Sequence, residues 1–358
     1  MKLDRKPTAS LEHSRQAWEP SRLPDLSDLP PFRQHRLIRG GHLQTVLSLR
    51  APAGGPSRPV LHWLTLDDGD QLALHEDLPE VWRSGDPSVM IVHGLCGCRT
   101  SPYMIRLANH FAGRGVRVFR LEMRGCGVGK DRSHELTHAG RSDDCLAALA
   151  RIAELTEAGP IAAIGVSLGG NQLLRAAGLM GSGERPRPSW LPRWNRLVAV
   201  SPPVDLARCS DNLERPMLRG YNRYFIRHLL SRLPEPIRRS EDKMKRFSKP
   251  WPKTLRELDE RITAPLSGFD GALDYYTRSS ALPVIPEIEI PTLILTAHDD
   301  PIVPIDCFRS LEPALRSHTA VKLLITPGGG HVGFFARGEE RFYMDRVIDR
   351  WCRWELEE

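Results

Sequence analysis

The chain has 358 residues, of which 41% are hydrophobic and 26% are charged, so its composition is that of a globular protein. No apolar run reaches the roughly 18 residues that a membrane-spanning helix needs, and residues 1–24 lack the apolar stretch of a secretory signal. Seven cysteines, an odd number in a chain of this length, argue against a disulfide framework. We therefore expect a cytoplasmic protein.

The secondary structure predicted along the chain begins with a polar, proline-rich segment at 1–58. We expect it to be an arm that wraps the domain, with a mobile first part. Residues 59–76 predict a β-hairpin around the turn sequence Asp67-Asp68-Gly69-Asp70. Strands are then predicted at 87–94, 116–125, 161–166, 196–204, 291–297 and 321–328, and helices at 103–115, 141–155, 169–180, 307–316 and 340–358. We expect Ser142 or Asp143 to cap the helix at 141–155.

Strands that alternate with helices in this way indicate an α/β fold, with a mainly parallel central sheet and helices on both faces. The alternation stops at about 205–280, where we expect a mostly helical cap insertion over the C-terminal edge of the sheet. The core would then consist of residues 59–204 and 281–358. The cap is basic, because 14 Lys and Arg residues lie between Glu214 and Arg261 against 7 Asp and Glu residues.

The sequence Gly165-Val166-Ser167-Leu168-Gly169 joins an expected strand to an expected helix. In an open α/β sheet, ligands bind beyond the C-terminal ends of the strands, where Ser167 lies. A sharp strand–Ser–helix turn exposes the hydroxyl and needs small neighbours. Glycine and serine are also common turn residues, so Ser167 is a candidate nucleophile only if the chain supplies its partners.

Those partners follow in the order acid then histidine. Asp299 and Asp300 come at the end of the strand at 291–297, and His331 lies in a glycine-rich loop after the last strand. Of the two carboxylates we favour Asp300, because Pro301 restricts it to an extended conformation, with Asp299 as the alternative. A structural role for His331 in its loop is the competing interpretation.

An oxyanion hole is the remaining requirement. His93-Gly94-Leu95 follows an earlier strand, so we predict the backbone N–H groups of Leu95 and Leu168 as the donors. His93 is expected to support this loop rather than to react, and His298 is expected to be an ordinary loop residue.

Two other motifs resemble ligand-binding sequences but do not match them fully. The segment 124–130, RGCGVGK, resembles a phosphate-binding loop, but Arg124 stands at the first glycine position and Asp131 at the Ser/Thr position. Cys96, Cys98 and Cys126 have no second pair at zinc-ribbon spacing, so we expect small buried thiols beside the site. We therefore predict no metal and no other cofactor.

The basic cap allows several interpretations. Four arginines spaced by four predict one charged helix face, and an apolar stripe accompanies it. These residues are Arg215, Arg219, Arg223 and Arg227, with Leu218, Tyr221, Phe225 and Leu229 in the stripe. A solvated helix face is the simplest interpretation. Weak contact with anionic lipid headgroups or an acidic substrate is the alternative, and we expect no nucleic-acid partner and no obligate protein partner.

Taken together, the motifs resemble the α/β-hydrolase superfamily, and within it the branch with an HLQT signature. That branch, also known as α/β-hydrolase family 4, holds the YheT-like hydrolases and related eukaryotic acyl-ester and lipid hydrolases. The resemblance spans about residues 35–350. It rests on five motifs in order, namely GGHLQTV (40–46), HGLCGCRTSPYM (93–104), RGCG (124–127), THAGRSDD (137–144) and GVSLGGNQLLR (165–175).

The resemblance implies a triad of Ser167, Asp300 and His331 and the hydrolysis of carboxylic esters. We predict a serine hydrolase that acts on acyl esters or lipids through an acyl-enzyme. Three alternatives stay open, which are a thioesterase, an acyltransferase with the same triad, and a protein that binds an apolar ligand without turnover.

Overall fold

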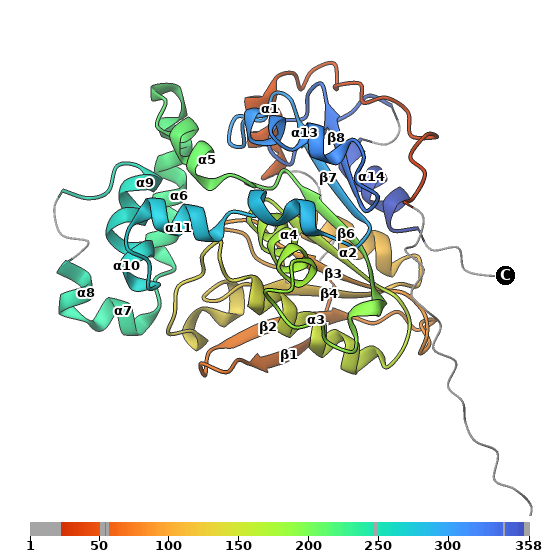
Figure 1. Cartoon of the computed structure of the whole chain (residues 1–358), viewed down its shortest axis with the longest axis horizontal. Helices are drawn as coiled ribbons and strands as arrows, with labels where there is room; N and C mark the ends of the chain where they lie inside the picture. The colour runs from red at the N-terminus through yellow and green to blue at the C-terminus, as the bar shows by residue number, and fades with distance from the viewer. Residues whose placement is uncertain (1–22, 51–53, 55–56, 246–249, 339–340, 354–358) are drawn as a thin grey trace, which may run out of the picture.

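In the computed structural model of the chain, residues 23–50, 54, 57–245, 250–338 and 341–353 are described. The central element is one eight-stranded sheet with the order β1-β2-β4-β3-β5-β6-β7-β8 (Figure 1). Its strands are β1 Val60–Thr65, β2 Gln71–Asp77, β3 Ser88–Val92, β4 Arg117–Glu122, β5 Ile161–Val166, β6 Trp194–Val200, β7 Thr292–Ala297 and β8 Val321–Thr326. Among the described strands, the pairs β1–β2 and β2–β4 are antiparallel and every other pair is parallel, so the predicted mainly parallel sheet is confirmed.

Helices cover both faces of this sheet, as predicted. One face packs against α3 and α4, and the other against α2 and α14, with two separate apolar clusters between the layers. These helices are α2 Pro102–Ala112, α3 Ser142–Thr156, α4 Leu168–Gly181 and α14 Tyr343–Trp351. Strands β3, β5 and β7 are buried along their whole length, because helices shield them on both sides.

Three local predictions are wrong. Helix α3 begins after Arg141 with no side-chain cap, because the Ser142 hydroxyl accepts a hydrogen bond from Arg175 instead. The helix expected at 307–316 is split into α12 Asp306–Arg309 and α13 Glu312–Leu315, because Pro313 has no N–H to continue the first helix. The closing helix α14 starts only at Tyr343, and residues 354–358 of its expected range lie outside the described residues.

The described part of the predicted arm packs beside the C-terminal part of the chain. The Phe32 ring lies 6.4 Å from the Phe334 ring and 5.3 Å from the Tyr343 ring, and Gln34 forms a β-bridge with Ala336. A helix that the sequence did not predict, α1 Gly41–Ser48, follows and brings this segment to the C-terminal edge of the sheet (Figure 1). The expected mobility of the first part of the arm concerns residues 1–22, which lie outside the described residues.

Residues 205–280 contain helices and connecting segments in their described part. The helices are α5 Leu206–Leu213, α6 Arg219–Ser231, α7 Glu235–Arg239, α8 Glu241–Lys245, α9 Leu255–Leu258, α10 Ala264–Leu266 and α11 Ala272–Ser279. A π-helical segment, Asp259–Thr263, joins α9 to α10. The prediction of four arginines on one helix is wrong for Arg215, because Pro216 starts a separate 3₁₀ turn and α6 begins only at Arg219. Within the described ranges, no helix has the length and apolar character needed to cross a bilayer.

Candidate active site

Ser167 stands at a sharp turn between β5 and α4. Its φ of 52° and ψ of −119° place a non-glycine residue in a strained region of the backbone map. The neighbouring glycines make this turn possible. A Cβ on Gly165 would lie 2.4 Å from the carbonyl oxygen of Gly169, and a Cβ on Gly169 would lie 2.7 Å from that of His93. The sequence therefore encodes a turn that holds the hydroxyl above the end of the strand.

The side chains of Ser167, His331 and Asp300 form one hydrogen-bonded chain. His331 Nε2 lies 2.9 Å from Ser167 Oγ, and His331 Nδ1 lies 2.9 Å from Asp300 Oδ2. The second oxygen, Asp300 Oδ1, accepts from the backbone N–H groups of Ile302 and Val303 at 2.8 and 3.0 Å. Asp300 accepts a hydrogen bond from the N–H at Nδ1 of His331. Nε2 therefore carries no proton and accepts a hydrogen bond from the Ser167 hydroxyl.

Asp299 has a different environment from its neighbour. Its Oδ1 accepts a hydrogen bond from the backbone N–H of Gly330 at 2.8 Å, and its backbone carbonyl packs against Gly41 so closely that a Cβ there would lie 1.7 Å away. The geometry therefore pairs His331 with Asp300, while Asp299 holds the loop that carries the histidine. His298 is exposed and lines neither cavity that reaches Ser167.

The two predicted oxyanion donors both lie beside Ser167. Leu168 is the first residue of α4, so its N–H belongs to the turn that has no acceptor within the helix. Leu95 follows Gly94, where an added Cβ would lie 3.0 Å from Ser167 Cβ. The N–H of Gly94 donates to Tyr103 Oη at 2.8 Å, which fixes the loop against α2. The role of Leu95 and Leu168 as donors stays a prediction.

His93 supports this loop from below. Its Nε2 accepts from the backbone N–H of Met123 at 3.1 Å, so Nδ1 carries the proton and donates to the Gly94 carbonyl at 2.8 Å. Burial lowers the pKa of His93 to about 4, which keeps the ring neutral near neutral pH. Both ring nitrogens are occupied, so the side chain is a fixed part of the loop.

This arrangement can be compared with known proteins. Residues 87–337 match the model of a family described as the alpha/beta hydrolase fold. The chain belongs to this family. It is also 31% identical over 345 residues to a protein of Escherichia coli (strain K12) named "Putative esterase YheT", with 93% of this chain and 96% of that one covered. The predicted membership of the YheT-like branch is thereby confirmed.

More distant relatives of this α/β hydrolase include an enzyme of Mus musculus named "Phospholipase ABHD3", which is 28% identical and covers 80% of this chain and 69% of its own. Among solved structures, an esterase from Pyrococcus furiosus superposes with a TM-score of 0.53 at 16% identity, covering 83% of this chain and 93% of that chain. At that identity the likeness shows the fold alone.

Helix α1 contacts the site, although no role in the site was predicted for its residues. Thr45 Oγ1 accepts from the backbone N–H of His331 at 2.8 Å and donates to the Gly41 carbonyl at 2.7 Å. The buried Gln44 side chain bonds both the N–H and the carbonyl of Phe335 at 2.7 and 3.1 Å. These residues belong to the HLQT motif, which was the signal in the sequence that pointed to them.

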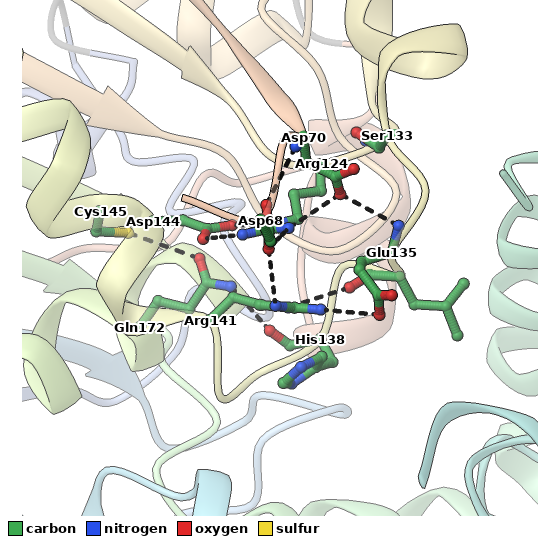
Figure 2. A network of polar contacts seen from close by, with 12 residues as sticks. Asp68, Asp70, Arg124, Ser133, Glu135, His138, Arg141, Asp144, Cys145 and Gln172 are labelled. Atoms are coloured by element: carbon green, nitrogen blue, oxygen red, sulfur yellow. Dashed lines mark hydrogen bonds and ion pairs between the residues drawn. The ribbon is translucent and has the colours of Figure 1, made fainter. Parts of the chain in front are cut away.

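A buried arginine organises the segments behind the site of this α/β hydrolase (Figure 2). Arg124 pairs with Asp144 on α3 and with Asp68 and Asp70 in the hairpin turn, with Nη1 2.9 Å from Asp70 Oδ2. Burial opposes the charge on Arg124, but its hydrogen bonds to Asp144 and Asp68 raise its pKa above the ordinary value. Asp70 also accepts from the backbone N–H of His134, so the cluster fixes the loop that precedes α3.

A cavity of about 530 Å³ opens at Ser167. Val46 of α1 and Leu49 directly after it line the cavity, as do Met217, Tyr221 and Phe225 of the 205–280 segment. The His42 ring stacks on Tyr221 with ring centres 5.8 Å apart, and Nδ1 lies 3.1 Å from the tyrosine oxygen. The cavity is mostly apolar and has the size of an ordinary small-molecule site.

The cysteines near the site do not form a metal centre in the described part of the chain. There, no group of three or more His, Cys, Asp or Glu side chains is arranged to hold a metal ion. All seven cysteines are free, and Cys126 is buried as expected. The expectation of a buried thiol is wrong for Cys96 and Cys98, which are only partly buried because their loop forms part of the surface beside the cavity.

Proposed function

We propose that this α/β hydrolase is a serine esterase that cleaves carboxylic esters through Ser167, His331 and Asp300. The observation that carries the proposal is the hydrogen-bonded chain of these side chains, which ends at the mouth of a largely apolar cavity. The names of the relatives support it, since two of them are named as esterases and one as a phospholipase. The residues 205–280 then act as the cap that roofs the substrate cavity.

In the proposed mechanism, Ser167 Oγ attacks the ester carbonyl while His331 Nε2 takes its proton. Asp300 holds the ring and stabilises the imidazolium. The negative charge on the carbonyl oxygen is stabilised by the N–H groups of Leu95 and Leu168, at the N-terminal end of α4. His331 gives the proton to the leaving alcohol. Water, activated by the same histidine, then cleaves the acyl-enzyme.

The proposal is tested with p-nitrophenyl esters of graded chain length and a fluorophosphonate probe. The wild-type protein should hydrolyse the esters and be labelled on Ser167. Replacing Ser167 by alanine should abolish labelling and reduce kcat by several orders of magnitude, because the parts of a triad act as a unit. An S167A variant that kept its esterase activity would overturn the assignment. Absence of any label on the wild type would favour a binding protein without turnover.

The same triad supports two related reactions, the hydrolysis of thioesters and the transfer of the acyl group to an alcohol, and different assays identify each. Acyl-CoA substrates assayed beside the esters separate a thioesterase from an esterase. Release of ester product in the presence of added alcohols, at the expense of free acid, identifies an acyltransferase. We favour hydrolysis because the relatives from Escherichia coli and mouse are named for hydrolytic activities.

We further propose that the substrate reaches the cavity from an anionic lipid surface. Exposed apolar side chains surround the cavity mouth, with Val46 51%, Leu49 54% and Met217 75% exposed. Next to them on α6, Arg219 and Arg223 are exposed, and no carboxylate among the described residues pairs with either of them. An apolar rim flanked by unpaired cations fits a bilayer interface with anionic headgroups.

Vesicle flotation tests this contact. The protein should float with vesicles of phosphatidylcholine mixed with phosphatidylserine, and not with phosphatidylcholine alone, and salt should weaken the binding. Replacing Arg219 by glutamate removes one cation and adds an anion, each worth about 1 kcal/mol, so affinity should fall more than tenfold. Replacing Arg151, an exposed arginine on α3, by glutamate is the control. Equal binding by both variants would contradict the proposed surface.

A further inference from the structure

A second, smaller cavity also reaches Ser167. It has a volume of about 100 Å³ and is lined by Ser167 and Leu168 from the core and by residues of the 205–280 segment. His331 lines the larger cavity but not this one. The larger cavity has about five times the volume of the smaller one. Only the larger cavity reaches His331, which gives a proton to the leaving alcohol in the proposed mechanism.

The small cavity has a polar wall within otherwise apolar surroundings. Asp259, which is only 6% exposed, accepts a hydrogen bond from the Tyr276 hydroxyl at 2.8 Å. The Tyr276 oxygen lies 3.1 Å from Ser210 Oγ, which accepts in turn from Arg256 Nε at 3.1 Å. Asp259 begins the π-helical segment between α9 and α10, and such segments are common at functional sites. Burial raises the pKa of Asp259 to about 6.

Two further polar groups, on His138 and Thr137, line this cavity. His138 Nδ1 accepts from the backbone N–H of Gly140 at 3.1 Å, and burial, with the nearby Arg141 and Arg124, lowers the pKa of His138 to about 3. The ring is therefore neutral, and Nε2 carries a proton that no described residue accepts. Thr137 Oγ1 also has no partner among the described residues, although it is buried. A fully buried group such as Thr137 Oγ1 needs a hydrogen-bonding partner, and a cavity beside it admits either water or a polar group of a ligand.

We propose that the small cavity binds the acyl part of the substrate, and that this acyl group is short and carries a hydroxyl. The inference rests on the proposed esterase function. The leaving oxygen must face His331 Nε2, so the alcohol part occupies the larger cavity and the acyl part points the other way. In this proposal a hydroxyl accepts from His138 Nε2–H and donates to the Asp259 carboxylate, which already accepts from Tyr276 and has further lone pairs.

Other polar groups fit this wall less well. An ammonium group on the substrate would meet the field of Arg124, Arg141 and Arg256, which lie close enough to influence the two titrating side chains. A carboxylate would face the oxygens of Asp259. A purely apolar acyl group would leave His138 Nε2–H and the Thr137 hydroxyl without partners, and such a site rejects an analogue that lacks the hydroxyl.

The test compares n-octyl esters of butanoic acid, of each enantiomer of 3-hydroxybutanoic acid and of decanoic acid, with kcat/KM measured from acid release. The full-length wild-type chain should prefer one 3-hydroxybutanoate enantiomer to butanoate by at least about tenfold, and decanoate should be the poorest substrate. A fifth ester, the butanoate of 1,3-octanediol at its primary hydroxyl, places a hydroxyl on the alcohol part and should show no preference over n-octyl butanoate.

The hydroxyl preference is the ratio of kcat/KM for the preferred 3-hydroxybutanoate to kcat/KM for butanoate. The variants Asp259→Leu and His138→Phe should each lower this ratio toward one. Because both values are measured on the same variant, a general loss of folded protein does not change the ratio. Glu257→Gln, at an exposed carboxylate two residues before Asp259, should keep the wild-type ratio. A wild type that cleaves none of the esters refutes the esterase function itself. Cleavage with no hydroxyl preference, a preference that survives in both variants, or a preference for the hydroxyl on the alcohol part overturns only the assignment of the small cavity.

Discussion

Thr45 connects helix α1 to the loop of His331, and its replacement by valine tests whether α1 positions the histidine. Valine has the same shape but removes the oxygen that accepts from the His331 N–H and donates to the Gly41 carbonyl. Thr45 is only 5% exposed at the wall of the larger cavity, so water has little access to the position of the lost partner. A buried N–H left without an acceptor costs about 1–3 kcal/mol.

If the lost free energy appears in the transition state, kcat/KM falls by about 5-fold to 150-fold, since 1.36 kcal/mol is a factor of ten. The assay is the hydrolysis of a short p-nitrophenyl ester, with the extent of fluorophosphonate labelling measured in parallel. Thr45→Ser keeps the oxygen and is the matched control, with activity close to that of wild type. Thr45→Val activity within twofold of wild type, or an equal loss in the serine variant, would refute a positioning role for the hydroxyl.

Three further predictions concern the acid of the triad, the turn at Ser167 and the buried Asp259. Asp300→Asn should lower kcat by about 10⁴-fold, as in other triads, while Asp299→Asn should cost less than about tenfold in the same ester assay. Gly165→Ala places a Cβ 2.4 Å from a carbonyl oxygen and should destabilise the fold by about 1–3 kcal/mol in urea unfolding. Burial raises the pKa of Asp259 from 3.8 to about 6, so the folded state holds a proton that the unfolded chain loses in this window. Wild-type stability should therefore fall by up to about 3 kcal/mol relative to Asp259→Asn as the pH rises from 4 to 7.

The sheet and its order of functional side chains were predictable because their signals are local. Buried strands are short apolar runs bounded by Gly and Pro, and each predicted strand of the parallel part is present. Since parallel strands end at one edge, residues placed after β5, β7 and β8 had to come close together. The structure brings Ser167, Asp300 and His331 into contact, although their catalytic roles stay predictions until the variants are measured.

The choice between Asp299 and Asp300 shows where local reasoning ends. The proline rule favoured Asp300 but could not say what Asp299 does, because its partners lie at Gly330 and Gly41, far away in the sequence. The same holds for α1, whose contact between Thr45 and His331 joins residues 286 positions apart. Its sequence, GHLQTVLS, is too short and too polar to predict a packed helix.

The small cavity depends on features that no stretch of the sequence contains. Its polar wall is assembled from His138 in the loop before α3, Ser210 on α5, Asp259 in the π-helical segment and Tyr276 on α11. No single one of these residues predicts a binding site from the sequence, and an isolated buried carboxylate is usually interpreted as a structural group. What gives the four a common meaning is that they line one cavity together with Ser167, although they come from separate parts of the chain. Substrate choice in this chain therefore lies in its tertiary packing, whereas the candidate nucleophile lies in a motif.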